Sequence, residues 1–318
     1  MNRWNHQPPR RPFYLASRIG NWGVLICLCL APSVRGQKQS PLPTHVIYVG
    51  ILEDDRREPD NSKTGPDENR IVRAMFQKTD SGWSSISSSP DRAITWTIAF
   101  DGRTIGEVGS LPDPGATSNP IDSGVQQLVL SGHNLPTIGA PSDQFAGLRA
   151  IWGTKVRRPL VVVSAPNSKD PDGWKRRIPS EKVESLARRA YRTDFPHVYK
   201  CDEEHPSQEE WHFPNSDIEL TRVYTSNKGS FLVEIQLKNA NCYIDDSNDP
   251  WANQWFFVDS HGSVRRIGGF LTLLDAGDYD GDGKSEVVFF LSQPEDTDGY
   301  VLYTADFRNR VALTWTYH

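Results

Sequence analysis

The chain has 318 residues, enough for one large or two ordinary domains with a buried core. Its hydrophobic content of 37% and aromatic content of 10% are typical of a globular protein and argue against disorder along the whole chain. No stretch reaches the roughly 20 apolar residues that a membrane-spanning helix needs, which disfavours an integral membrane protein.

The first 36 residues differ in kind from the rest. They contain no acidic residue and five basic ones, which are Arg3, Arg10, Arg11, Arg18 and Arg35. A short apolar run from Val24 to Ala31 follows, and Gly36 then supplies a small residue. This order is typical of a secretory signal peptide. We expect cleavage after residue 36 and an extracytoplasmic protein, periplasmic or secreted, with no integral membrane span after cleavage.

Removing this leader changes the charge balance. It takes away five of the 35 basic residues and none of the 40 acidic ones, so residues 37–318 carry a net charge of −10. Such a field repels polyanions unless a basic patch opposes it. The short basic runs Arg157-Arg158 and Lys175-Arg176-Arg177 do not amount to such a patch. Nucleic acid is therefore not an expected partner.

The exported part is predicted to be β-structure almost throughout. Short runs rich in β-branched and aromatic residues, most of them bounded by Gly, Pro, Asn or Asp, predict strands. These strands are 45–52, 71–77, 94–100, 103–108, 127–130, 159–164, 218–225, 231–237, 255–259, 263–267, 286–291, 300–304 and 311–317. Asp101-Gly102 and residues 259–263 predict hairpin turns. Residues 54–69 and 109–124 are predicted to be loops.

One segment has a helical period instead. Ser180 can cap a helix that has Glu181 in its first turn, and apolar residues recur at helical spacing up to Tyr191. Arginines follow near the end, where cations suit the helix dipole. We expect one amphipathic helix over Ser180–Thr193.

Two cysteines remain outside the leader, Cys201 and Cys242. In an oxidising compartment they favour one disulfide bridge that closes a loop of about 40 residues. The alternative is two unrelated buried thiols, because spacing alone does not bring two side chains together.

The residues from Asp278 to Glu286 form an acidic loop. Asp278, Asp280 and Asp282 occupy positions 1, 3 and 5, and Gly281 and Gly283 permit tight turns. The carbonyl of Lys284 at position 7 and Glu286 at position 9 complete a set of oxygen ligands suited to Ca²⁺. An EF-hand places its last carboxylate at position 12 between helices, whereas Glu286 leads directly into an apolar strand. The alternative is an acidic turn that binds nothing.

Residues 274–289, Leu-Asp-Ala-Gly-Asp-Tyr-Asp-Gly-Asp-Gly-Lys-Ser-Glu-Val-Val-Phe, resemble an FG-GAP/VCBS-like repeat. Such repeats are the calcium-binding blade units of integrin-type β-propellers. The C-terminal half also resembles a family of exported bacterial proteins that carry this element. The resemblance implies metal ligands at Asp278, Asp280, Asp282 and position nine, where Asp is usual and this chain has Glu286. No second such loop is present.

The resemblance implies a β-propeller-like fold of about five or six blades, most of them degenerate, in a single domain over residues 37–318. The calcium-binding blade would span about 271–310. At 40–50 residues a blade, the chain length fits this number. The strand at 45–52 would supply the fourth strand of the last blade. The alternative is a sandwich or two packed sheets with one hairpin of this type.

Two functions follow. The first is a binding or scaffold module for a protein or carbohydrate ligand, with structural calcium. The second is a hydrolase that acts on carbohydrate or another polymer in the propeller channel. The sequence contains no Gly-x-Ser-x-Gly, no His-Glu-x-x-His and no paired-carboxylate motif, and we assign no catalytic residue. We therefore favour the non-enzymatic role.

Overall fold

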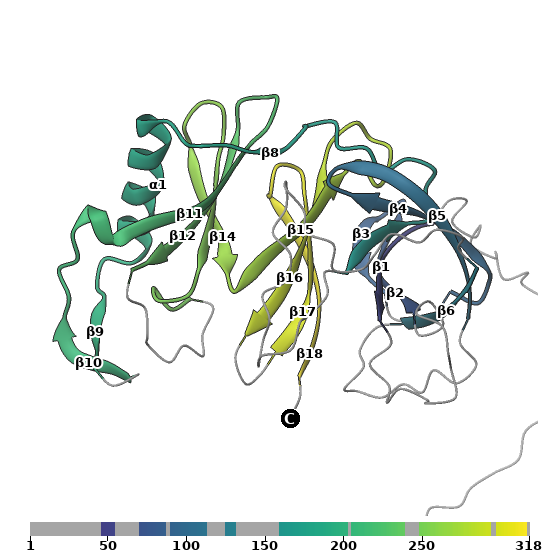
Figure 1. Cartoon of the computed structure of the whole chain (residues 1–318), viewed down its shortest axis with the longest axis horizontal. Coiled ribbons are helices and arrows are strands. Elements are labelled where there is room, and N and C mark those ends of the chain that lie inside the picture. The colour runs from purple at the N-terminus through teal and green to yellow at the C-terminus, as the bar shows by residue number, and fades with distance from the viewer. Residues whose placement is uncertain are drawn as a thin grey trace, which may run out of the picture. The chain divides into compact units, whose positions relative to one another are not determined.

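The computed structural model describes residues 46–54, 70–86, 90–112, 125–131, 159–202, 205–238, 248–293 and 297–316. In these ranges the regular structure consists of antiparallel β-sheets, one α-helix and one short 3-10 helix (Figure 1). The predicted all-β class with a single helix is confirmed for the described residues. These residues all belong to one compact unit, residues 43–318.

The N-terminal strands form a seven-stranded sheet. Hydrogen-bonded pairings lead from β1 through β7, β4, β5, β6 and β2 back to β1, and β3 extends β2. The strands are β1 (Ile47–Asp54), β2 (Arg70–Thr79), β3 (Gly82–Ser85), β4 (Ile94–Phe100), β5 (Arg103–Pro112), β6 (Val125–Ser131) and β7 (Leu160–Val163). Asp101 and Gly102 have φ of 54° and 70°, as the predicted hairpin turn between β4 and β5 requires.

The C-terminal strands form two meanders in succession, each with four consecutive antiparallel strands. The first contains β11 (Ile218–Thr225), β12 (Phe231–Leu237), β13 (Gln254–Val258) and β14 (Val264–Gly269), with β8 (Lys175–Arg176) added beside β11. The second contains β15 (Leu271–Gly277), β16 (Glu286–Gln293), β17 (Thr297–Thr304) and β18 (Asn309–Thr316). A separate hairpin pairs β9 (Tyr199–Asp202) with β10 (His205–Glu210), and the 3-10 helix η1 (Asn215–Asp217) precedes β11.

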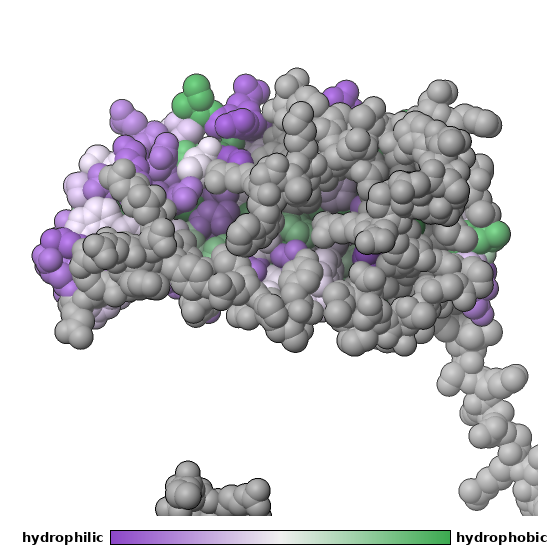
Figure 2. Space-filling model, turned by 60° about the horizontal axis from the view of Figure 1, so that its bottom comes forward, coloured by the Kyte–Doolittle hydropathy of each residue, from purple (hydrophilic) through white to green (hydrophobic). Residues whose placement is uncertain are grey.

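The helix α1 (Glu181–Asp194) matches its prediction closely. The Ser180 side chain accepts a hydrogen bond from the Val183 amide, and Val183, Ala187 and Tyr191 form the buried side of the helix. The exposed side is charged, and the region around α1 is mostly hydrophilic in Figure 2. No helix in the described ranges is both long enough and apolar enough to span a bilayer.

Both faces of the four-stranded sheet β15–β18 are buried, and β16 shows this most clearly. Val287, Phe289 and Leu291 belong to a core shared with the five-stranded sheet, while Val288 and Phe290 belong to a core shared with the seven-stranded sheet. The continuous apolar run of β16 follows from this arrangement, because alternate side chains enter different cores.

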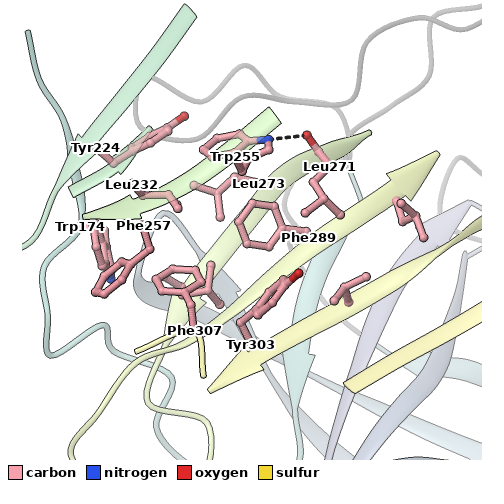
Figure 3. Close-up of a cluster of buried hydrophobic side chains, with 14 residues drawn as sticks. Trp174, Tyr224, Leu232, Trp255, Phe257, Leu271, Leu273, Phe289, Tyr303 and Phe307 are labelled. Atoms are coloured by element: carbon pink, nitrogen blue, oxygen red, sulfur yellow. Dashed lines mark hydrogen bonds between the residues drawn. The ribbon is translucent and has the colours of Figure 1, made fainter. Parts of the chain in front are cut away.

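The core between the two C-terminal sheets is rich in aromatic residues (Figure 3). Trp255 is fully buried, lies 5.4 Å from Phe289 between ring centroids, and donates a 2.8 Å hydrogen bond from Nε1 to the Leu271 carbonyl. Phe289 also makes an edge contact with Tyr303 at 5.6 Å. These contacts join the two meanders through one packed layer.

The strand predictions hold with one correction of topology. Every strand predicted from the sequence corresponds to a strand of the structure, whereas β3, β8, β9, β10 and β15 were not predicted. The fourth strand of the last sheet is β15, not the strand at 45–52. The latter, β1, pairs with β2 and β7 instead. β15 lacks alternation because nearly every residue is buried, with Leu273 and Leu274 in different cores.

The turn between β17 and β18 has an unusual backbone. Ala305, Asp306 and Phe307 have φ of 52°, 54° and 63°, and this left-handed conformation disfavours residues that carry a Cβ. The turn places the largely buried Phe307 ring against Trp174, at 6.1 Å, and Phe257, at 5.0 Å. The strained backbone therefore completes the aromatic core.

We expect Ala305→Gly to raise the free energy of unfolding by about 1 kcal/mol, because glycine adopts a positive φ without steric cost. Urea unfolding measures the change. Ala312→Gly is the matched control, since Ala312 lies in the extended strand β18 and its replacement should lower stability by roughly 0.5–1 kcal/mol. Equal destabilisation by both substitutions would contradict the assigned backbone strain.

Candidate metal centre

The acidic loop lies in the connection between β15 and β16. The pairing of Gly277 with Glu286 closes this connection, so residues 278–285 form a hairpin loop anchored on two buried strands. Gly281 and Gly283 have φ of 76° and 81°. These left-handed positions explain why glycine alternates with aspartate there, because the chain must turn sharply between successive carboxylates.

The structure brings three of the predicted ligands together. One carboxylate oxygen from each of Asp278, Asp280 and Glu286 lies within 4.8 Å of the other two. Oxygens bound to one Ca²⁺ at about 2.3–2.6 Å are no more than about 5 Å apart, so one ion can reach all three. Asp282 lies outside this group and is exposed. The Lys284 amide donates a hydrogen bond to Asp282 Oδ1 at 2.8 Å.

Hydrogen bonds within the loop hold its carboxylates in place. Asp280 Oδ1 accepts from the Asp282 amide at 3.2 Å, and Asp282 Oδ1 accepts from the Lys284 amide at 2.8 Å. Asp278 Oδ2 accepts from the Gly283 amide at 3.0 Å. These bonds fix one oxygen of each aspartate on the backbone. The other oxygen of Asp278, Oδ1, is buried and has no hydrogen-bond partner within the described part of the chain.

Glu286 is the most buried member of the group, with 2% of its surface exposed. Its Oε2 accepts a 2.8 Å hydrogen bond from the Tyr279 amide. Burial, followed by the negative charge of Asp280, raises the pKa of Glu286 to about 8. Asp282 and Asp278 contribute in the same direction. A cation in the loop would offset this repulsion.

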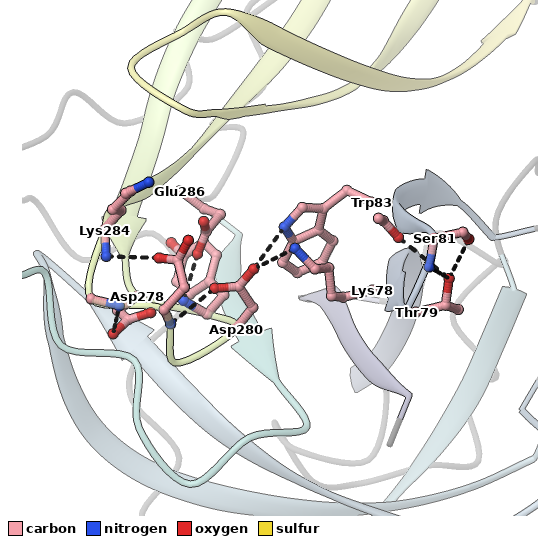
Figure 4. Close-up of polar contacts among 12 residues, drawn as sticks. Lys78, Thr79, Ser81, Trp83, Asp278, Asp280, Lys284 and Glu286 are labelled. Atoms are coloured by element: carbon pink, nitrogen blue, oxygen red, sulfur yellow. Dashed lines mark hydrogen bonds and ion pairs between the residues drawn. The ribbon is translucent and has the colours of Figure 1, made fainter. Parts of the chain in front are cut away.

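Two side chains from the seven-stranded sheet contact the loop (Figure 4). Lys78 Nζ lies 2.8 Å from Asp280 Oδ2, and Trp83 Nε1 donates a 3.2 Å hydrogen bond to the same oxygen. Lys78 and Trp83 approach Asp280 from one side, while Asp278 and Glu286 lie on the other. The loop therefore connects two sheets that are far apart in sequence.

A second segment, residues 167–174, follows β7 and packs against the acidic loop. The Lys169 carbonyl accepts from the Asp278 amide at 3.1 Å, and the Ser285 hydroxyl donates to buried Asp170. Asp170 also accepts from the amides of Asp172, at 3.0 Å, and Trp174, at 2.7 Å. Burial raises the pKa of Asp170. This segment was not identified from the sequence, although Asp170-Pro171-Asp172-Gly173 has the composition of an acidic turn.

The other predicted sites fall where side chains are not described. Residues 1–36, the predicted signal peptide, lie outside the described residues, as does Cys242. Cys201 lies in β9, opposite Pro206. The signal peptide and the Cys201–Cys242 bridge stay predictions. Comparison of the chain with protein-family models, with curated proteins and with solved structures found no match.

Proposed function

We propose that this chain is an exported calcium-binding protein that acts as a binding or scaffold module for a protein or carbohydrate ligand. In this proposal the acidic loop binds Ca²⁺ in a structural role. The observation that carries it is the convergence of carboxylate oxygens from Asp278, Asp280 and Glu286 within 4.8 Å of one another. The buried Asp278 Oδ1, which has no hydrogen-bond partner among the described residues, is available as a cation ligand.

The burial of the ligands favours a structural ion over a catalytic one. The Asp280 side chain is 4% exposed and Glu286 is 2% exposed, so neither carboxylate is presented to a substrate. Calcium takes six to eight oxygens, and an ion held on carboxylates this buried would have little room beside it for a substrate. The ion would stabilise the connection between β15 and β16, which together span the centre of two cores.

We further propose a propeller-like relationship for the C-terminal half. The strands β11–β14 and β15–β18 are consecutive four-stranded meanders that pack face to face, as neighbouring propeller blades do. The seven-stranded sheet has a different strand order, so the proposal covers two blade-like units and extends to further blades only by resemblance. The export proposal rests on the basic, apolar and small-residue order of residues 1–36.

The calcium proposal is tested by calorimetry and thermal unfolding of the metal-free protein. We expect saturable Ca²⁺ binding and, at free calcium near 100 times Kd, an increase of about 2.7 kcal/mol in the free energy of unfolding. Mg²⁺ should bind more weakly, because it demands near-octahedral geometry and keeps its waters. Identical melting in calcium and in chelator, with no heat of binding, would refute the proposal.

The hydrolase alternative gains no support from two grooves in the described ranges. A groove of about 600 Å³ runs along α1 and contains Glu181 and Glu184, but Glu184 pairs with Arg188 at 3.4 Å and Glu181 is exposed. A second groove, of about 310 Å³, is lined by Arg266, Tyr303 and other residues between β14 and the last sheet. Neither groove brings a pair of buried carboxylates together.

A further inference from the structure

Lys78 occupies an unusual position next to the acidic loop. It lies in β2 directly opposite Trp83 of β3, and its ammonium group is 5.6 Å from the centre of the Trp83 ring. From this hairpin it reaches Asp280, which is 202 residues further along the chain. The indole of Trp83 donates to the same oxygen. Asp280 is thus bound by a protein cation as well as belonging to the three-carboxylate group.

The Lys78 ammonium group and a calcium ion are both positively charged and would bind the same Asp280 carboxylate. The Lys78 side chain is 34% exposed, whereas the Asp280 side chain that it contacts is 4% exposed. In the absence of metal, the ammonium group partly neutralises the repulsion among Asp278, Asp280 and Glu286. A calcium ion bound to the same carboxylate would be repelled by the ammonium group, because like charges a few ångströms apart destabilise each other in a partly buried site.

We propose that Lys78 acts as a tethered cation that competes with calcium for Asp280 and so sets the calcium affinity of the loop. This inference rests on the proposed calcium site. Calcium binding would weaken the Lys78–Asp280 contact, and that contact would weaken calcium binding to the same degree, since coupling between two binding events is reciprocal. The β2–β3 hairpin would then be held more loosely on the loop when calcium is bound.

Calorimetric titration of CaCl₂ into the metal-free full chain tests the affinity effect. We expect Lys78→Met and Lys78→Gln to tighten calcium binding by about tenfold, within the usual range of coupling between sites. Lys78→Arg keeps the charge and should bind calcium as the wild type does. Lys182→Met, on the exposed side of α1, removes the same charge elsewhere and should also leave the affinity unchanged.

A second readout follows the lysine itself. An amine-modifying reagent should label Lys78 faster in calcium than in chelator, and the peptide that contains Lys182 serves as the internal reference for mass spectrometry. Unchanged or weaker calcium binding in both Lys78→Met and Lys78→Gln, or equal labelling of Lys78 in calcium and chelator, would overturn the competition. Absence of calcium binding in the wild type would instead overturn the proposed calcium site.

Discussion

Replacement of Glu286 by glutamine is expected to abolish the calcium-dependent stabilisation and to raise the melting temperature in chelator above that of the wild type. The substitution removes a ligand charge, so the gain of about 2.7 kcal/mol at 100 times Kd should disappear. Without metal, the wild type must on folding either protonate Glu286 or place its charge beside Asp278 and Asp280, whereas the neutral amide does neither. The amide oxygen can still accept the hydrogen bond from Tyr279. The substitution should therefore lower the melting temperature in calcium and raise it in chelator.

The same substitution should alter the pH dependence of the metal-free protein. The pKa of Glu286 rises from 4.5 to about 8 on folding, so the folded protein binds the proton more tightly than the unfolded chain. This contribution to stability is complete below pH 4.5 and is lost as the pH rises through about 8. Wild-type stability in chelator should fall over this interval. The fall should be smaller in Glu286→Gln.

Scanning calorimetry in calcium and in chelator, repeated between pH 5 and pH 9, measures both effects. Glu219→Gln is the matched control, because Glu219 is exposed on β11 and its replacement should change stability by no more than about 0.5 kcal/mol. If the Glu286→Gln variant is less stable than the wild type in chelator, then the metal-free wild type already compensates the charge of Glu286.

Local sequence signals predicted where the helix and strands lie better than they predicted which strands pair. The cap at Ser180 and the helical spacing of Val183 and Tyr191 placed α1 within one residue at each end. The strand at 45–52 was also found, but its partners were wrong, because nothing in its own residues distinguishes a last propeller strand from β1 of another sheet. Partner choice depends on contacts between distant segments, which periodicity does not encode.

The candidate metal centre shows the same division. The spacing of Asp278, Asp280 and Glu286 predicted their convergence, since these residues are close in sequence and the glycines between them fix the turn. Lys78 and Asp170 could not be predicted as neighbours of the loop, because both come from segments more than 100 residues away. An isolated lysine in a strand carries no signal for a carboxylate partner on another sheet.

Phe289→Ala is expected to lower the free energy of unfolding by about 3–5 kcal/mol, the largest stability change predicted for this chain. Phe289 is fully buried in β16 and contacts both Trp255 of the five-stranded sheet and Tyr303 of its own sheet. Truncation leaves a cavity that these rigid rings cannot fill. Leu111→Ala is the control, because Leu111 in β5 is 40% exposed and should cost far less.

The effect of Phe289→Ala should extend across both C-terminal sheets. Since the ring belongs to the core that joins them, its removal should weaken the protection of amide hydrogens in β12 and in β16 together. Hydrogen exchange with mass spectrometry separates the two strands, and urea unfolding should still show one transition. If protection falls in β16 while β12 is unchanged, then the two meanders unfold independently. Joint loss of protection would mean that the two C-terminal sheets unfold as one cooperative unit through the core that contains Phe289.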